Sequence, residues 1–313
     1  MAVRTTWLRI LALGVWFAVT GLGAQDSEAS LMNEVQAALE SGHLDEALAK
    51  ARQATGQYPQ SSELRQLLGA ALFKKGLNGD ARAAFRRAIE LDAGDPQNYF
   101  NLALVDLAEH RYQPAANSLE TCVRLDPRNA QAHLLLGRAY HNQNQTLPAI
   151  EEFKKALALN SKLPLAHYHL GFAYQSLGDL ASALGEYRRE MDIHPEFPDA
   201  HWLAGNIELK HGDLEAASRS FREAIRLRPQ AYQAHYGLAR VCLARREYAE
   251  AETELGAALR VRPDDTELHY TLARLYQQTG KKDAAEREFA FCAAAHAEEQ
   301  KKSTGIAGTV PQP

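Results

Sequence analysis

The stretch that decides the fold is Pro164–Phe197, which reads PLAHYHLGFAYQSLGDLASALGEYRREMDIHPEF. Apolar residues recur at three- and four-residue steps on both sides of Gly178, and this spacing predicts two amphipathic helices. Gly178 breaks the first helix and Asp179 is a favourable start for the second, while Pro195 ends the second. The stretch is therefore predicted to form an antiparallel helix pair.

The same pattern recurs every 34 residues without an insertion or a deletion. A fixed period in this range is typical of a solenoid, in which each unit buries its apolar face against its neighbours. The copies are predicted to span residues 28–299 and to begin at Glu28, Ser62, Pro96, Ala130, Pro164, Pro198, Tyr232 and Thr266.

Small residues at fixed places predict where the helices approach each other closely. The eighth place of a copy is glycine or alanine in seven copies, and larger apolar residues stand at the seventh and twenty-fourth places. The twentieth place is alanine in every copy: Ala47, Ala81, Ala115, Ala149, Ala183, Ala217, Ala251 and Ala285.

These residues resemble the tetratricopeptide repeat (TPR) family, and the match extends over residues 28–299. The resemblance implies an all-α fold, a right-handed α-solenoid superhelix of eight 34-residue helix pairs. The first copy departs from the family pattern, with Glu34, Val35 and Ala38 at key places, which suits a terminal unit. Asp106, Glu190 and Glu208 put acids at places that are usually apolar or small, and the sequence leaves their exposure open.

The two ends of the chain lie outside the repeats. Residues 1–24 combine arginines with an apolar run and end in small residues, so they are predicted to be a secretory signal peptide. Cleavage after Ala24 predicts an extracytoplasmic protein, in a bacterium a periplasmic one, and an uncleaved anchor stays open as the alternative. Residues 303–313 lack periodicity and are predicted to be a disordered tail.

The sequence offers no enzyme signature and no cofactor motif, so the chain is predicted not to be an enzyme. The net charge of −4 disfavours a nucleic-acid partner. Histidines 34 residues apart lie too far from each other to share one ion, so they are interpreted as packing residues and no metal site is predicted. They occupy the fourth place of five consecutive copies: His133, His167, His201, His235 and His269.

The resemblance implies that the fifth and ninth places of each copy line a concave groove. These places hold aromatic residues and arginines, which dominate protein-binding hot spots. An alternative interpretation, that the rings mainly pack on neighbouring repeats, stays open. The predicted partner-binding residues are Phe100, Arg138, Tyr168, Phe172, Trp202, Asn206, Tyr236, Arg240, Tyr270 and Arg274.

The leading prediction is a scaffold that holds a peptide segment or a partner protein in this groove, as an adaptor or assembly factor of the cell envelope. A component that binds polysaccharide is the alternative, because stacked aromatic rings also suit sugars. No membrane insertion is expected after signal cleavage. Phe291, at a place that is otherwise mostly polar, predicts self-association through the C-terminal end, and local packing of its ring is the alternative.

Overall fold

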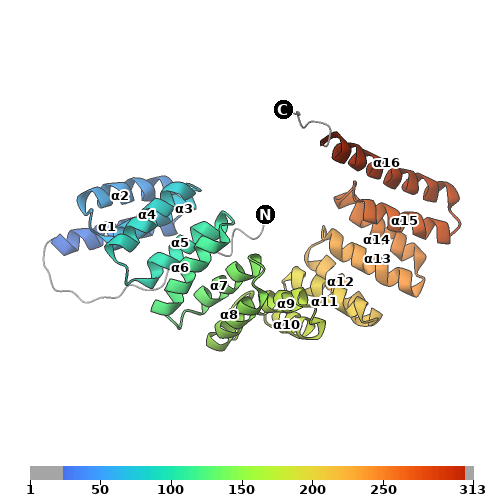
Figure 1. Ribbon diagram of the computed structural model, residues 1–313, viewed down its shortest axis with the longest axis horizontal. Helices are drawn as coiled ribbons and strands as arrows, with labels where there is room; N and C mark the ends of the chain where they lie inside the picture. Colours follow the sequence, from blue (N-terminus) through green and yellow to red (C-terminus); the bar gives the residue numbers. More distant parts are fainter. Residues whose placement is uncertain (1–23, 307–313) are drawn as a thin grey trace, which may run out of the picture. The chain divides into compact units, whose positions relative to one another are not determined.

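In the computed structural model, residues 24–306 are described, and over that range the chain forms sixteen α-helices and no strand (Figure 1). The all-α prediction is therefore confirmed. The chain divides into two compact units, and the boundary in the sequence falls between Pro127 and Arg128. The first unit contains α1 (Ala24–Glu40), α2 (Leu44–Gln57), α3 (Ser62–Lys74), α4 (Asn78–Leu91), α5 (Pro96–Ala108) and α6 (Tyr112–Leu125).

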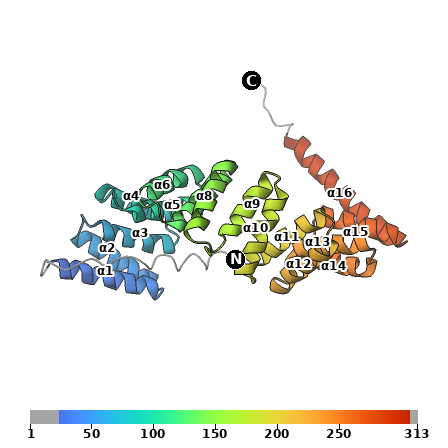
Figure 2. The same cartoon turned by 90° about the horizontal axis from the view of Figure 1, so that it is seen from below.

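The second unit holds the remaining helices. Each helix in it packs on the next one along the chain, and α11 also contacts α13 (Figures 1 and 2). Its helices are α7 (Ala130–Asn142), α8 (Thr146–Leu159), α9 (Ala166–Ser176), α10 (Leu180–Ile193), α11 (Pro198–Lys210), α12 (Leu214–Leu227), α13 (Tyr232–Arg245), α14 (Tyr248–Val261), α15 (Thr266–Gln278) and α16 (Lys282–Ile306).

The helix boundaries follow the 34-residue period. Helices α3, α5, α7, α11, α13 and α15 each begin at the first residue of a predicted copy. Helices α9 and α10 are separated at Gly178, whose φ of +81° lies in the left-handed region that favours glycine. Helix α1 begins four residues before Glu28, and α9 begins two residues after Pro164.

The late start of α9 has a local cause. Leu165 adopts a left-handed conformation with φ of 66°, so the helix begins only at Ala166. The buried carboxylate of Glu190, on α10, accepts the backbone N–H groups of Leu165 and Tyr168, both at 3.1 Å. Because the first N–H groups of a helix have no partner inside it, Glu190 performs the task of an N-terminal cap from the neighbouring helix.

The small residues stand at the predicted close approaches. Ala183 and its counterparts at the twentieth place are at most 5 % exposed. The ring of Phe221 fills the space beside two glycines, Gly205 on its own partner helix α11 and Gly237 on the next helix α13. A Cβ atom at Gly205 would lie 2.9 Å from that ring, and one at Gly237 would overlap it. The aromatic ring and the glycines therefore define the spacing of these helices.

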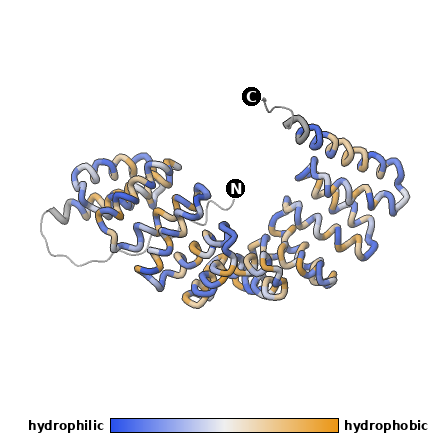
Figure 3. The backbone as a smooth tube through the Cα atoms, viewed as in Figure 1, coloured by the Kyte–Doolittle hydropathy of each residue, from blue (hydrophilic) through white to orange (hydrophobic). Residues whose placement is uncertain are grey.

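Apolar and polar residues alternate along the helices, as Figure 3 shows, and the buried ones form a succession of small cores. Three acids that the sequence left unassigned are buried and satisfied. Asp106 contacts Arg82 and Arg111 at 2.9 and 3.2 Å, and Glu208 accepts from Arg188 at 2.9 Å. The third is Glu190. These acids tie helices to one another and are not groove residues.

Helix α16 extends further than predicted. It continues to Ile306, so residues 303–306, which were predicted to belong to the irregular tail, are helical. Lys302 pairs with Glu298 at 3.2 Å, one turn earlier, and such a pair supports a helix end. The rest of the predicted tail and the signal peptide up to residue 23 lie outside the described residues. None of the described helices combines the length and the apolar character that crossing a membrane requires.

Candidate functional site

The predicted groove residues of the second unit lie on consecutive first helices. Tyr168 is on α9, Trp202 on α11, Tyr236 on α13 and Tyr270 on α15. The exposure of these rings differs along the series. Tyr168, Trp202 and Tyr236 are half-buried, whereas Tyr270 is 49 % exposed. This series of aromatic rings, the aromatic ladder, therefore belongs partly to the core and partly to the surface.

An aromatic cluster surrounds Tyr168. Its ring lies nearly parallel to that of Phe172, at 16° and 6.4 Å between centroids, and edge-on to Phe197 at 5.0 Å. Phe172 is 39 % exposed and also contacts His141 on α7, at 5.3 Å. Burial raises the pKa of Tyr168, and the nearby carboxylate of Asp199 adds to the shift. The cluster thus leaves Phe172 exposed to solvent above half-buried rings.

Tyr236 links α13 to α15. Its hydroxyl donates to Oε1 of Glu267 at 2.9 Å and lies 3.3 Å from Oγ1 of Thr271. The guanidinium of Arg240 lies 5.8 Å from the centroid of the same ring, a cation–π distance. Burial is the main reason that the pKa of Tyr236 is raised. Tyr236 therefore holds two repeats together as well as lining the surface.

Two of the predicted arginines are available for a ligand. Arg240 and Arg274 are exposed, and within the described residues neither forms an ion pair. They stand at the same place of successive copies, on α13 and α15. Arg138 is half-buried and has its own interactions, and Asn206 is half-buried. The exposed positive charge of this face therefore lies mainly on its C-terminal helices, α13 and α15.

One predicted partner-binding residue needs correction. Phe100, on α5 of the first unit, is 3 % exposed and belongs to the core, because a side chain at the fifth place is covered there. Trp202 is half-buried and packs against two neighbouring apolar clusters, which favours the alternative interpretation, packing on neighbouring repeats, at this residue. Phe291, predicted as an exposed contact, packs on His269 with 3.9 Å between ring centroids. The alternative interpretation, local packing, describes Phe291 better.

The histidine column packs between helices, as interpreted, and it also has a partner that the sequence analysis missed. In four copies the histidine Nδ1 atom contacts a glutamate 19 residues later, on the second helix of the same pair. The distances lie between 2.5 and 2.6 Å for His133–Glu152, His167–Glu186, His235–Glu254 and His269–Glu288. A glutamate recurring at the twenty-third place was the signal for this pairing.

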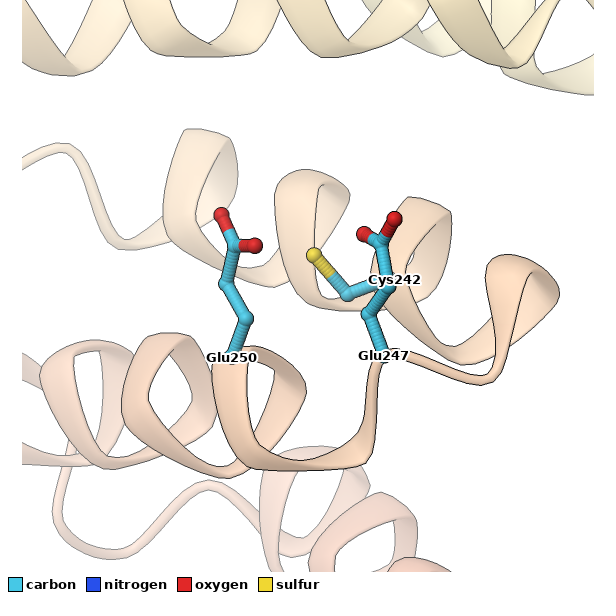
Figure 4. Close-up of side chains that lie close together, drawn as sticks. All are labelled: Cys242, Glu247 and Glu250. Atoms are coloured by element: carbon cyan, nitrogen blue, oxygen red, sulfur yellow. The ribbon is translucent and has the colours of Figure 1, made fainter.

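The side chains of Cys242, Glu247 and Glu250 converge at the end of α13 and the start of α14 (Figure 4). Their ligand atoms lie within 4.8 Å of one another, a spacing that a metal ion could bridge. Burial raises the pKa of the Cys242 thiol to about 12, and the two carboxylates add to that shift. Glu250 is moreover engaged by Arg222 at 2.8 Å. We assign this cluster no ligand.

Comparison with known families agrees with the helix pairing. Models of the tetratricopeptide repeat or TPR repeat match residues 32–96, 137–178, 168–217, 208–269 and 246–290. These ranges fall on the helix pairs of both units. The chain is a tetratricopeptide repeat protein. The resemblance inferred from the 34-residue period is confirmed.

Solved TPR structures share the fold. MamA from Desulfovibrio magneticus is 26 % identical over 56 % of this chain and 99 % of its own, with a TM-score of 0.52. PilF from Pseudomonas aeruginosa is 17 % identical over 67 % of this chain and 96 % of its own, with a TM-score of 0.61. YrrB, a TPR protein described as having an unusual peptide-binding site, is 21 % identical over 59 % and 95 %, with a TM-score of 0.51. The likeness to PilF and YrrB is one of fold.

One curated relative is the BBSome complex member BBS4 homolog of Drosophila melanogaster, which is 32 % identical over 97 residues. The match covers 30 % of this TPR chain and 19 % of the relative. This chain thus corresponds to about a fifth of that relative's length. The shared segment supports the repeat assignment and is too short to transfer the relative's assembly to this TPR protein.

Proposed function

We propose that this TPR protein is a non-enzymatic scaffold that binds a peptide segment or a partner protein on the face formed by α9, α11, α13 and α15. The observation that carries the proposal is the set of exposed aromatic and arginine side chains on the first helices α9, α13 and α15. Phe172, Tyr270, Arg240 and Arg274 are all exposed. Large rings and arginines are the side chains from which binding energy at protein interfaces mainly comes.

The arrangement suits an extended ligand. Because the same places recur every 34 residues, one contact site is offered by each helix pair, and a peptide can occupy several in series. The arginines lie toward α15, so the ligand segment there carries carboxylates, which arginine can bind with two parallel hydrogen bonds. The peptide-binding site described for YrrB makes this use of a TPR fold reasonable.

We also propose that the protein acts in the cell envelope, in the periplasm of a bacterium, as an adaptor or assembly factor. The support is the arginine-containing apolar segment at residues 1–24, which has the layout of a secretory signal. Fractionation of cells that produce the full chain tests this location. Recovery of the protein in the cytoplasm with residues 1–24 still attached would exclude it.

The binding face is tested by affinity capture from an envelope extract with the full chain and with surface variants. Phe172→Ser combined with Tyr270→Ser and Arg274→Glu removes exposed contacts while leaving Trp202 and Tyr236 in place. The control is Leu147→Ser, which alters a 67 % exposed leucine on the second helix α8. A partner held by the wild type and the control but lost by the triple variant supports the proposal. Equal capture by all three proteins places the binding site elsewhere.

Polysaccharide binding is the second candidate, favoured by one observation. The rings of Tyr168 and Phe172 lie nearly parallel, with Phe172 exposed, a geometry on which a sugar ring can stack. Glycan-array binding that is lost on Phe172→Ser but kept on Arg274→Glu supports this candidate. Array silence combined with capture of a protein removes it.

A further inference from the structure

One copy of the repeat lacks the glutamate that completes the histidine column. Glu152, Glu186, Glu254 and Glu288 hold this place on α8, α10, α14 and α16, but on α12 it is Ser220. The histidine itself is retained as His201 on α11. His201 therefore keeps the position of its counterparts without a carboxylate opposite its Nδ1 atom.

The hydrogen bonding of His201 identifies which nitrogen is available. Its Nε2 atom lies 2.8 Å from the carbonyl oxygen of Pro195, and a carbonyl only accepts, so Nε2 carries a hydrogen. The side chain is buried, with 7 % of the residue exposed. Within residues 28–302, whose side chains are described, Nδ1 has no hydrogen-bond partner. In His235 the same two atoms contact Pro229 and Glu254, so Nδ1 is the atom that takes a carboxylate.

A cavity of about 320 Å³ lies in front of His201. Three helices contribute polar side chains to its wall: Arg188 from α10, Glu208 from α11, and Arg219, Ser220 and Glu223 from α12. The space is large enough for a carboxylate and a short carbon chain. It lies beside Ser220, at the place of the repeat where four other copies have a glutamate.

The two acids around the cavity are already paired, which leaves the guanidinium of Arg219 and the imidazole of His201 for a ligand. Glu208 is matched by Arg188 at 2.9 Å and by the hydroxyl of Ser220 at 2.7 Å. Glu223 is matched by Arg226, with contacts of 2.6 and 2.9 Å. Arg219 forms no ion pair with any of the described residues, and it lines the cavity together with His201. An anion there meets Arg219 and the imidazole, while both acids are already paired.

We propose that the cavity binds a carboxylate, held between Nδ1 of His201 and the guanidinium of Arg219. The geometry has an internal precedent. Glu186 contacts His167 and also a base, Arg189, and Glu152 contacts His133 and Lys155 in the same way. In the copy that contains His201, an external ligand provides the carboxylate. In the other two copies, a glutamate of the chain itself provides it. Its source is either a small free carboxylate or an acidic side chain of a partner protein.

Both ring nitrogens of His201 donate in the bound state. Because Nε2 already donates to the carbonyl of Pro195, a carboxylate at Nδ1 requires a hydrogen on Nδ1 as well. The charged groups that face His201 are Arg188, Glu208, Arg219 and Glu223, with Arg226 behind Glu223.

The test is a titration of the full chain with sodium acetate against sodium chloride at equal ionic strength, followed by NMR of the histidine rings. His201 is assigned with His201→Gln. The ring of His235, whose Nδ1 is occupied by Glu254, is the control inside the same molecule. A saturable shift of His201 that clearly exceeds that of His235 supports the site. A shift no larger than that of His235 overturns it.

Two variants sharpen the result. Ser220→Glu restores the internal carboxylate and is expected to abolish the acetate response, and Arg219→Gln is expected to weaken it about tenfold. An unchanged response in a folded Ser220→Glu protein contradicts the proposal. If that variant does not fold, Arg219→Gln and the wild-type comparison with His235 still decide. A short peptide with one glutamate that binds over tenfold more tightly than acetate identifies a protein ligand, and equal affinity identifies a small carboxylate.

Discussion

Nδ1 of His235 lies 2.5 Å from Oε2 of Glu254, while Nε2 of the same ring lies 3.0 Å from the carbonyl oxygen of Pro229. One buried imidazole thus joins α13 to its partner helix α14 and to the loop that precedes α13. Both acceptors favour a ring that donates from both nitrogens. The hydrogen bond to Glu254 is the main reason that the pKa of His235 is raised.

The first prediction concerns pH. Because the folded pKa of His235 is raised, this contact contributes its full stability below the unfolded value of about 6.5 and loses it as the pH rises through the folded value. Glu254→Gln should therefore lower the free energy of unfolding by about 1 kcal/mol near pH 5.5 and by less near pH 9. Chemical denaturation at both pH values measures this. Glu196→Gln, on an exposed loop, is the control, and an equal loss at both pH values for Glu254→Gln would contradict the assignment.

The second prediction concerns the glycines beside Phe221. Gly237→Ala places a Cβ atom where the buried ring lies, and we expect a loss of about 1–3 kcal/mol despite the better helix propensity of alanine. Gly256→Ala, on α14, adds a Cβ atom with nothing within 4 Å and should gain up to about 1 kcal/mol. Thermal and chemical denaturation compare the two. The same sign for both substitutions would refute the close-approach account.

The third prediction concerns the buried cap of α9. Glu190→Gln weakens the bonds to the backbone N–H groups of Leu165 and Tyr168 and should cost about 2–3 kcal/mol. Hydrogen exchange at the amide of Tyr168 should accelerate more than at the amides of α13. Glu196→Gln again serves as the control. Unchanged protection of Tyr168 would show that Glu190 does not cap this helix.

A fourth prediction separates binding from packing on the aromatic ladder. Trp202→Ala should cost about 2–4 kcal/mol, because the indole packs on two apolar clusters. Tyr270→Ala should change stability by no more than about 0.5 kcal/mol, because the ring is 49 % exposed. Urea denaturation of the two variants tests this. Equal losses would mean that Tyr270 is a core residue and would weaken the proposed binding face.

The fifth prediction concerns self-association of the protein through α16, at a surface other than Phe291. Ile225 and Leu259 are partly buried against a core cluster, whereas Ala293 at the same place of α16 is exposed. Phe289 is partly exposed, although Phe221 at its place is fully buried. If copies associate through this face, Ala293→Glu should lower the association constant at least tenfold in analytical ultracentrifugation, with Leu147→Ser as the control. A wild-type protein that is monomeric at every concentration excludes this mode.

The repeat could be recognised in the sequence because each unit needs the same residue types at the same places. Alternating apolar steps, Gly178 at a left-handed turn and Ala183 at a helix crossing are short-range requirements, so they leave a pattern in the chain at a fixed spacing. The buried or exposed state of the fifth place could not be read in this way. Phe100 and Tyr270 hold equivalent places, yet one is 3 % exposed and the other 49 %.

The sequence by itself determined the all-α repeat, its period and the start of most first helices, since helix geometry and close packing act within and between adjacent units. Only the tertiary structure decided which aromatic rings reach the surface, because exposure depends on what the neighbouring helices cover. It also paired Glu190 with the start of α9 and left His201 facing a cavity beside Ser220. Such contacts join residues on different helices, whose side-chain distances no spacing along the chain specifies.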